Sequence, residues 1–219
     1  MFKRAILFLL FAVLVQAQAS QTQAPPTLQT QTERKTSEPY TGDLSIFETP
    51  GRDEKLQINR VMDILGIGPG KNVADIGAAS GWFSVRAARR IGNGTVYAVD
   101  INPEAIRYID ARAKKEHLAN ITTILAKPDD PHLPSKVNAV LVLKTYHEIA
   151  APVSLLRSLR PSLTPDARLG VIDRNGNGAD HGIAKEVVIQ EADEAGYRLL
   201  EQYDFVKDGM DYFLVFGLK

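Results

Sequence analysis

The sequence predicts an α/β fold in which a doubly wound, seven-stranded sheet, mostly parallel, ends in a C-terminal antiparallel hairpin. Short apolar runs rich in Val, Ile and Leu alternate with segments of helical periodicity between residues 51 and 195. Such alternation is typical of sheets built from strand–helix–strand units. Two further apolar runs follow with no helix between them, which favours an antiparallel pair at the end of the chain.

The first half of the pattern has clear starts and stops. Leu56, Val61 and Leu65 share one helical face, and a Gly-Pro-Gly turn ends that helix. Asn102 can cap a later helix that has Pro103 in its first turn. The elements expected here are a helix over residues 51–67, a strand over 72–76, a helix over 81–92, a strand over 95–101 and a helix over 102–117.

The second half continues the alternation and then breaks it. Its apolar runs are short and β-branched, whereas the segments between them carry helical spacing until Gly196. The elements expected here are strands over residues 121–125, 137–143 and 167–173, helices over 153–159 and 183–195, and a hairpin of strands over 197–205 and 211–218.

The N-terminal residues are not expected to be part of the fold. Lys3 and Arg4 precede an apolar run over residues 5–15, and small residues lead to a cleavage point before Ser20. This order is that of a secretory signal peptide, and the run is too short for a membrane span of about 20 residues. We therefore expect a signal peptide over residues 1–19, a flexible Gln/Thr/Pro-rich tether over 20–40 and a folded domain over 41–219.

These features predict an exported protein, periplasmic or secreted, that is tethered to the membrane only if the signal is uncleaved. Within the mature chain no stable membrane span is expected. The sequence does not indicate an oligomeric state.

The composition excludes several classes of function. The chain has 26 basic and 26 acidic residues. It therefore lacks the excess of basic residues that would suggest a nucleic-acid partner. It has no cysteine, which excludes disulfides, thiolate zinc sites and cysteine nucleophiles. No metal is expected either, because His147 and Glu148 are adjacent, and adjacent side chains rarely share one ion without partners from elsewhere.

A glycine-rich turn over residues 77–81 follows the first strand, directly after Asp75. In a doubly wound sheet, ligands bind at this point, and small residues let the backbone approach them. A carboxylate there would repel the pyrophosphate of a dinucleotide, but it suits the positive charges of S-adenosylmethionine. Ala79 and Trp82 also stand where the dinucleotide pattern needs glycines. Asp100, at the end of the next strand, can accept hydrogen bonds from ribose hydroxyls.

Residues 73–101 resemble the first two motifs of the class I S-adenosylmethionine-dependent methyltransferases, a family with a Rossmann-like fold, and are closest to the type 11 and ubiquinone/menaquinone methyltransferases. The family pattern D-x-G-x-G-x-G is matched except that Ala79 replaces its middle glycine. The resemblance implies that the methionine end of the cofactor is lined by Asp75, Gly77, Ala79 and Gly81, the ribose by Asp100, and the adenine by Ile101 and, near its amino group, Asp129.

The residues after the strand over 137–143 are expected to face the methyl acceptor. They are Tyr146, His147 and Glu148, of which the histidine can act as a base that the glutamate orients. His181, in a Gly/Asn/Asp-rich loop on the same edge of the sheet, can serve as a base or a substrate contact. We therefore expect methyl transfer to a small molecule. The alternatives are an exported, non-catalytic binding protein of the same fold and an NAD(P)-dependent oxidoreductase.

Overall fold

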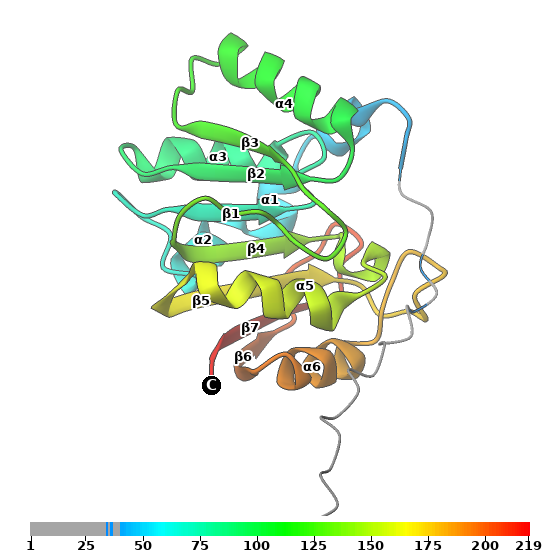
Figure 1. Cartoon of the computed structure of the whole chain (residues 1–219). Helices are drawn as coiled ribbons and strands as arrows, with labels where there is room; N and C mark the ends of the chain where they lie inside the picture. The colour runs from blue at the N-terminus through cyan, green and yellow to red at the C-terminus, as the bar shows by residue number, and fades with distance from the viewer. Residues whose placement is uncertain (1–33, 35, 37–39) are drawn as a thin grey trace, which may run out of the picture. The chain divides into compact units, whose positions relative to one another are not determined.

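The structure, a computed structural model, describes Arg34, Thr36 and residues 40–219 (Figure 1). The expected signal peptide and most of the expected tether lie outside the described residues. Within the described part, no helix is both long enough and apolar enough to cross a membrane. Arg34 contacts the domain through two hydrogen bonds from its guanidinium to Glu191 (2.9 and 3.0 Å), so the packed unit includes a residue upstream of position 41.

The regular elements follow the alternation that the sequence predicts. The strands are β1 (Val73–Ile76), β2 (Val96–Asp100), β3 (Ile121–Leu125), β4 (Val137–Leu143), β5 (Leu163–Asp173), β6 (Tyr197–Tyr203) and β7 (Tyr212–Leu218). The helices are α1 (Arg52–Leu56), α2 (Ile58–Ile64), α3 (Trp82–Ile91), α4 (Pro103–Lys115), α5 (Pro152–Leu159) and α6 (Lys185–Glu194), with 3₁₀ helices η1 (Leu44–Phe47), η2 (Tyr146–Glu148) and η3 (Arg160–Ser162).

The seven strands form one sheet in the order β3-β2-β1-β4-β5-β7-β6. The strands β1 to β5 are parallel, and β7 runs antiparallel to both β5 and β6. The expected fold class is thus confirmed. The strand order reverses at β1, which pairs with β2 on one side and β4 on the other. A crevice outside the carboxyl ends of these strands is where ligands bind in such sheets.

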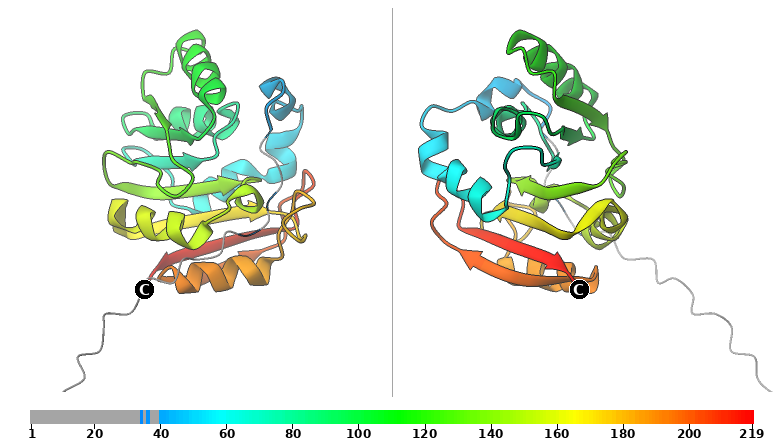
Figure 2. Two further views of the ribbon diagram at one scale, coloured as in Figure 1. Left: turned by 45° about the vertical axis from the view of Figure 1, so that its right-hand side comes forward. Right: turned by 90° about the vertical axis from the view of Figure 1, so that its left-hand side faces the viewer.

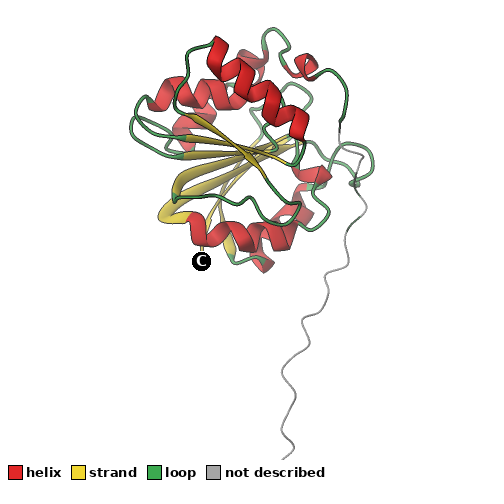
Figure 3. Cartoon of the chain, turned by 45° about the horizontal axis from the view of Figure 1, so that its top comes forward, coloured by secondary structure: helices red, strands yellow, loops and turns green. Residues whose placement is uncertain are grey.

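Helices cover both faces of the sheet (Figure 2, Figure 3). One face packs against α2 and α3 through buried Val61, Phe83 and Ile91. The other packs against α5 and α6, with Leu156 and Val188 among its buried side chains. Because both faces are covered, the central strands are apolar throughout, as the runs in the sequence suggest.

The expected helix over residues 51–67 is wrong in one respect: it is two helices. Gln57 separates α1 from α2 in the left-handed region, with φ of 46°. The carbonyl of Lys55 accepts a hydrogen bond from the backbone N–H of Lys207 (2.8 Å), in the connection between β6 and β7. This tertiary contact lies beside the break, where Gln57 leaves the helical conformation.

Candidate active site

A cavity of about 870 Å³ opens at the carboxyl ends of the central strands. Its lining comes from the β1–α3 turn, the end of β2, η2, the loop after β5 and the segment over residues 40–47. This volume lies within the roughly 300–1,000 Å³ of small-molecule sites.

The β1–α3 turn brings backbone rather than side chains to the cavity. Gly77 has φ of 72°, and a Cβ there would lie 2.2 Å from Thr145 Cγ2. Ala79 has φ of 48°, so it occupies the left-handed region without being glycine. Gly81 caps α3 with φ of 71°, and a Cβ there would press on Ile109 at 3.1 Å. Gly77 and Ala79 line the cavity, whereas Gly81 supports the turn from outside the lining.

Two carboxylates stand at the ends of β1 and β2. Asp75 is 2% exposed and accepts a hydrogen bond from Ser84 Oγ at 2.6 Å. Burial raises the pKa of Asp75 to about 7, although the hydrogen bond from Ser84 acts in the opposite direction. Asp100 accepts from the backbone N–H groups of Ala79 (2.8 Å) and Asn102 (2.9 Å), one on each oxygen. Burial also raises the pKa of Asp100.

This end of the cavity fits the cofactor expected from the sequence. Each oxygen of Asp100 can accept more than one hydrogen bond, so both keep capacity for a vicinal diol. Ile101 lines the cavity beside Asp100, and its side chain is 48% exposed, as an apolar wall for a flat ring would be. Buried Asp75 offers a carboxylate to a cation. Asp129 does not fit this arrangement: it is exposed and absent from the lining, and its carbonyl accepts from Ser158 Oγ (2.8 Å).

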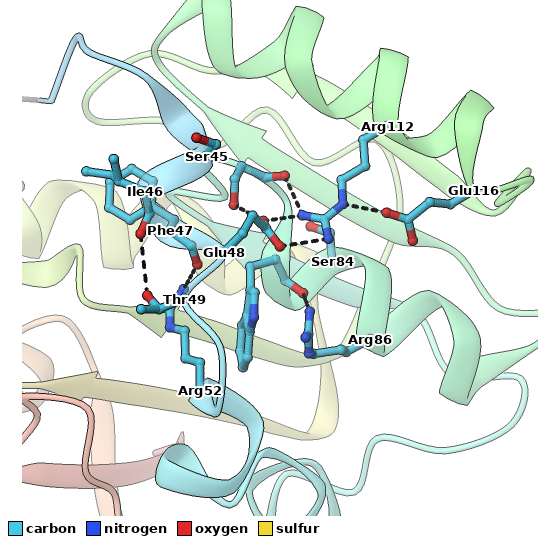
Figure 4. Close-up of polar contacts among 12 residues, drawn as sticks. Ser45, Ile46, Phe47, Glu48, Thr49, Arg52, Ser84, Arg86, Arg112 and Glu116 are labelled. Carbon is cyan, nitrogen blue, oxygen red and sulfur yellow. Dashed lines mark hydrogen bonds and ion pairs between the residues drawn. The ribbon is translucent and has the colours of Figure 1, made fainter.

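The segment over residues 40–48 lies along the cavity and contributes Tyr40, Leu44 and Phe47 to its lining. Glu48 fixes this segment to the domain: it accepts from Arg112 Nη2 at 2.9 Å (Figure 4) and from Ser80 Oγ at 2.6 Å. We call residues 40–48 the cover segment.

Arg52 fixes the cover segment from its other side. Its guanidinium donates to the carbonyl of Phe47 (2.9 Å; Figure 4), pairs with Asp208 (3.1 Å) and lies over the Trp82 ring at 4.5 Å from the centroid. Trp82 therefore stacks against an arginine at the position where the dinucleotide pattern needs a glycine.

The acceptor end of the cavity contains a buried histidine held by an acid. Asp173, at the end of β5, is fully buried. Its two oxygens accept from the backbone N–H groups of Arg174 (2.9 Å) and His147 (3.1 Å) and lie 3.0 Å from His147 Nδ1. A carboxylate only accepts, so Nδ1 carries a proton, and in the neutral imidazole the free electron pair is then on Nε2. That Nε2 lies 3.7 Å from Glu148 Oε1.

His181 completes this cluster from the loop after β5. Its ring centroid lies 5.9 Å from that of His147, at an interplanar angle of 85°. His147, Glu148 and His181 all line the cavity, so the structure brings together three of the four residues expected at the acceptor end.

The fourth, Tyr146, is not in the cavity. It is fully buried in the core, outside the lining, and the guanidinium carbon of Arg34 lies 5.1 Å from its ring centroid. The cause is local: Tyr146–Glu148 form a 3₁₀ helix, in which successive side chains turn by about a third of a revolution. When His147 and Glu148 face the cavity, Tyr146 must face the core. The expectation that Tyr146 is catalytic is corrected accordingly.

Sequence reasoning missed Asp173 and the contacts that hold the cover segment in place. Asp173 ends an apolar strand, as Asp75 and Asp100 do, so the same signal of an acid at a strand end could have identified it. The cover segment carried no such signal, because its contacts are to residues at positions 80 and 112.

Comparison of the sequence with known proteins finds methyltransferases. A family model described as a methyltransferase domain matches residues 73–166. Nocamycin O-methyltransferase of Saccharothrix syringae is 28% identical over 117 residues, which are 51% of this chain and 41% of that protein. Protein-L-isoaspartate O-methyltransferase of Pyrococcus horikoshii is 28% identical over 102 residues, 46% of this chain and 45% of that protein. The chain therefore spans less than half the length of these curated relatives.

The fold itself matches solved structures over more of the chain. A S-adenosylmethionine-dependent methyltransferase from Aquifex aeolicus superimposes with a TM-score of 0.72 at 22% identity, covering 82% of this chain and all of that one.

Proposed function

We propose that residues 73–166, which a methyltransferase-domain family model matches, form a domain of the class I S-adenosylmethionine-dependent family, and that the protein transfers a methyl group from this cofactor to a small-molecule acceptor. The observation that carries the proposal is that Asp75, from β1, and Asp100, from β2, both line one cavity together with the β1–α3 turn.

When bound, the cofactor would supply an electrophilic methyl group to an oxygen or nitrogen of the acceptor; sulfur would keep the electron pair of the carbon–sulfur bond, and the acceptor's proton would pass to water. The chain contributes position. Asp100 orients the ribose, the backbone of the turn admits the methionine end, and the cover segment limits access of water. Fixing two reactants in this way accounts for much of the rate of a direct transfer.

Several observations favour a small acceptor. The chain has no net charge, so it offers no general attraction for a polyanion. The cavity has the volume of a small-molecule site and is lined in part by the cover segment. Of the relatives, one is named for nocamycin and one for a protein residue. Their names alone therefore do not decide between a small-molecule acceptor and a protein acceptor.

Binding of S-adenosylhomocysteine, followed by calorimetry, tests the cofactor half of the proposal. We expect Asp100→Asn to weaken binding by roughly five- to 150-fold, because unpaired buried polar groups cost about 1–3 kcal/mol. Asp129→Ala is the matched control, since this exposed carboxylate lies off the cavity and its loss should leave the affinity unchanged. Equal affinity in the wild type and Asp100→Asn would contradict the assignment.

Turnover separates the proposal from the two alternatives. An exported binding protein of this fold would bind S-adenosylhomocysteine and methylate nothing in a metabolite extract supplied with labelled cofactor. An oxidoreductase would instead show a melting shift with NAD(P), since a ligand specific to the folded state raises its stability.

We also propose that the protein is exported, on the basis of the charged, apolar and small-residue order over residues 1–19. A fusion of residues 1–40 to a periplasmic reporter should be secreted and should begin at Ser20. An intact Met1 on a cytoplasmic product would contradict export.

A further inference from the structure

We propose that His147, Glu148 and His181 bind one divalent transition-metal ion at the acceptor end of the cavity. Two imidazoles and one carboxylate are a ligand set that ions such as Zn²⁺ and Fe²⁺ accept. The sequence argument against a metal was that His147 and Glu148 lacked a partner from elsewhere, and the fold supplies that partner in His181.

The three side chains already converge. One ligand atom from each lies within 4.8 Å of the others. Two ligands of a tetrahedral ion at about 2.0–2.1 Å lie about 3.3 Å apart, so only a small closure is needed. His181 is exposed and Glu148 half-buried, so both can rotate towards His147, which is fixed in the core.

The buried end of the cluster is built as metal-binding histidines usually are. Asp173 holds the proton on His147 Nδ1, which leaves Nε2 as the ligand atom and directs it to the cavity. A carboxylate behind a ligating histidine fixes its tautomer and orientation. Asp173 is also fixed, because two backbone N–H groups donate to it. This arrangement is independent of the distances among the three ligands.

The loop that presents His181 is held by its own contacts. Arg174 Nε donates to the carbonyl of His181 (2.8 Å), and the backbone N–H of Ile183 donates to the carbonyl of Arg174 (2.8 Å). The two ends of the loop come so close that a Cβ on Gly182 would lie 2.7 Å from the carbonyl oxygen of Asn175. These contacts place the histidine beside η2.

The chemistry of this set suggests what the ion would do. Two neutral imidazoles and one carboxylate leave a divalent ion with a net positive charge and open coordination positions. These positions would face the cavity, so we infer that the ion binds an oxygen of the acceptor and favours its deprotonated form. The inferred binding of the acceptor by the ion rests on the proposed methyl transfer, whereas the metal site itself does not.

Metal binding can be measured without turnover. Tag-free protein, treated with a chelator that is then removed, is titrated with Co²⁺, and the visible absorption of the bound ion is followed. We expect one ion per chain in the wild type and at least tenfold weaker binding in His181→Ala and in Glu148→Gln. His132→Ala is the control, because this histidine pairs with Asp130 outside the cavity lining and its loss should change nothing.

A third variant tests the buried support. Asp173→Asn should weaken Co²⁺ by about 10- to 100-fold, the usual effect of losing such a partner. Circular dichroism identifies any variant that fails to fold, and the exposed His181 keeps the test valid if buried substitutions do. Equal Co²⁺ affinity in the wild type and a His181→Ala/Glu148→Gln double variant would overturn the site. S-adenosylhomocysteine binding, measured on the same metal-free samples, reports separately on the proposed function.

Discussion

Ala79 adopts a backbone conformation that glycine adopts more easily, in the middle of the turn proposed to receive the cofactor. Its φ of 48° costs an L-residue about 1–2 kcal/mol. Glycine would avoid this strain, but it loses more conformational entropy on folding, which offsets part of the gain. We therefore expect Ala79→Gly to raise the free energy of unfolding by about 0.5–1 kcal/mol in urea titrations. Ala78→Gly, at a neighbour without positive φ, should lower it, and the same sign for both variants would contradict this account.

Asp75 makes the stability of the ligand-free protein depend on pH. Its pKa of about 7 in the fold lies above the ordinary 3.8, so between these pH values the folded chain holds a proton that the unfolded chain has released. The free energy of unfolding should fall as pH rises through this window and stay reduced above it. The groups that act on Asp75 are Ser84, Asp100 and Arg52.

Asp75→Asn removes this titration. Relative to the wild type, the variant should gain roughly 2–4 kcal/mol between pH 4.5 and pH 8, measured by urea unfolding at each pH without ligand. Parallel pH profiles for the two proteins would show that Asp75 titrates normally.

At the scale of elements, the β1–α3 turn depends on contact with η2. Gly77→Ala would combine a positive φ with a 2.2 Å approach to Thr145, whereas Gly66→Ala combines a similar φ (67°) with open space. We expect the Gly66 variant to lose about 1 kcal/mol from backbone strain alone, and the Gly77 variant to lose at least 1 kcal/mol more. Equal losses in thermal unfolding would mean that the turn moves aside without cost.

The boundaries of the helices and strands show where local sequence patterns are sufficient to predict the structure. The strand over residues 137–143 begins and ends where the apolar run does, because a strand buried on both faces needs a nearly continuous run. The strand over residues 121–125 also has the expected bounds, although it is only partly buried. The helix over residues 51–67 is broken at Gln57, which takes a positive φ next to the point where the β6–β7 connection bonds to Lys55. The 3₁₀ form of η2 likewise decides that His147 faces the cavity and Tyr146 does not.

At the scale of the molecule, Glu48 joins the cover segment to the β1–α3 turn and to α4. Glu48→Ala would remove the carboxylate that accepts from Ser80 and Arg112, although Arg112 keeps Glu116, and would release the cover from the cavity. We expect S-adenosylhomocysteine to bind about five- to tenfold more weakly, a cost of about 1 kcal/mol. Faster hydrogen exchange over residues 40–48 should accompany the change.

Glu104→Ala is the control for this experiment, because Glu104 pairs with Arg107 on the exposed side of α4. Unchanged affinity in Glu48→Ala would show that the cover does not contribute to cofactor binding.

The sequence by itself determined the α/β class, most of the elements and the placement of Asp75, Asp100 and the glycine-rich turn at one edge of the sheet. These follow from local signals: the period of the apolar residues, the glycines of one turn and the acids that end two adjacent strands. Parallel strands end at one edge, so Asp75 and Asp100 must lie close together once the class is known. Only the tertiary structure decided the insertion of β7 between β5 and β6, the Asp173–His147 pair, and the approach of His181 to Glu148. Each of these joins residues far apart in the chain, or depends on the direction of a side chain in a short 3₁₀ turn. Hydrophobic periodicity carries no information about either, because it reports which face of an element is buried and not which distant element covers it.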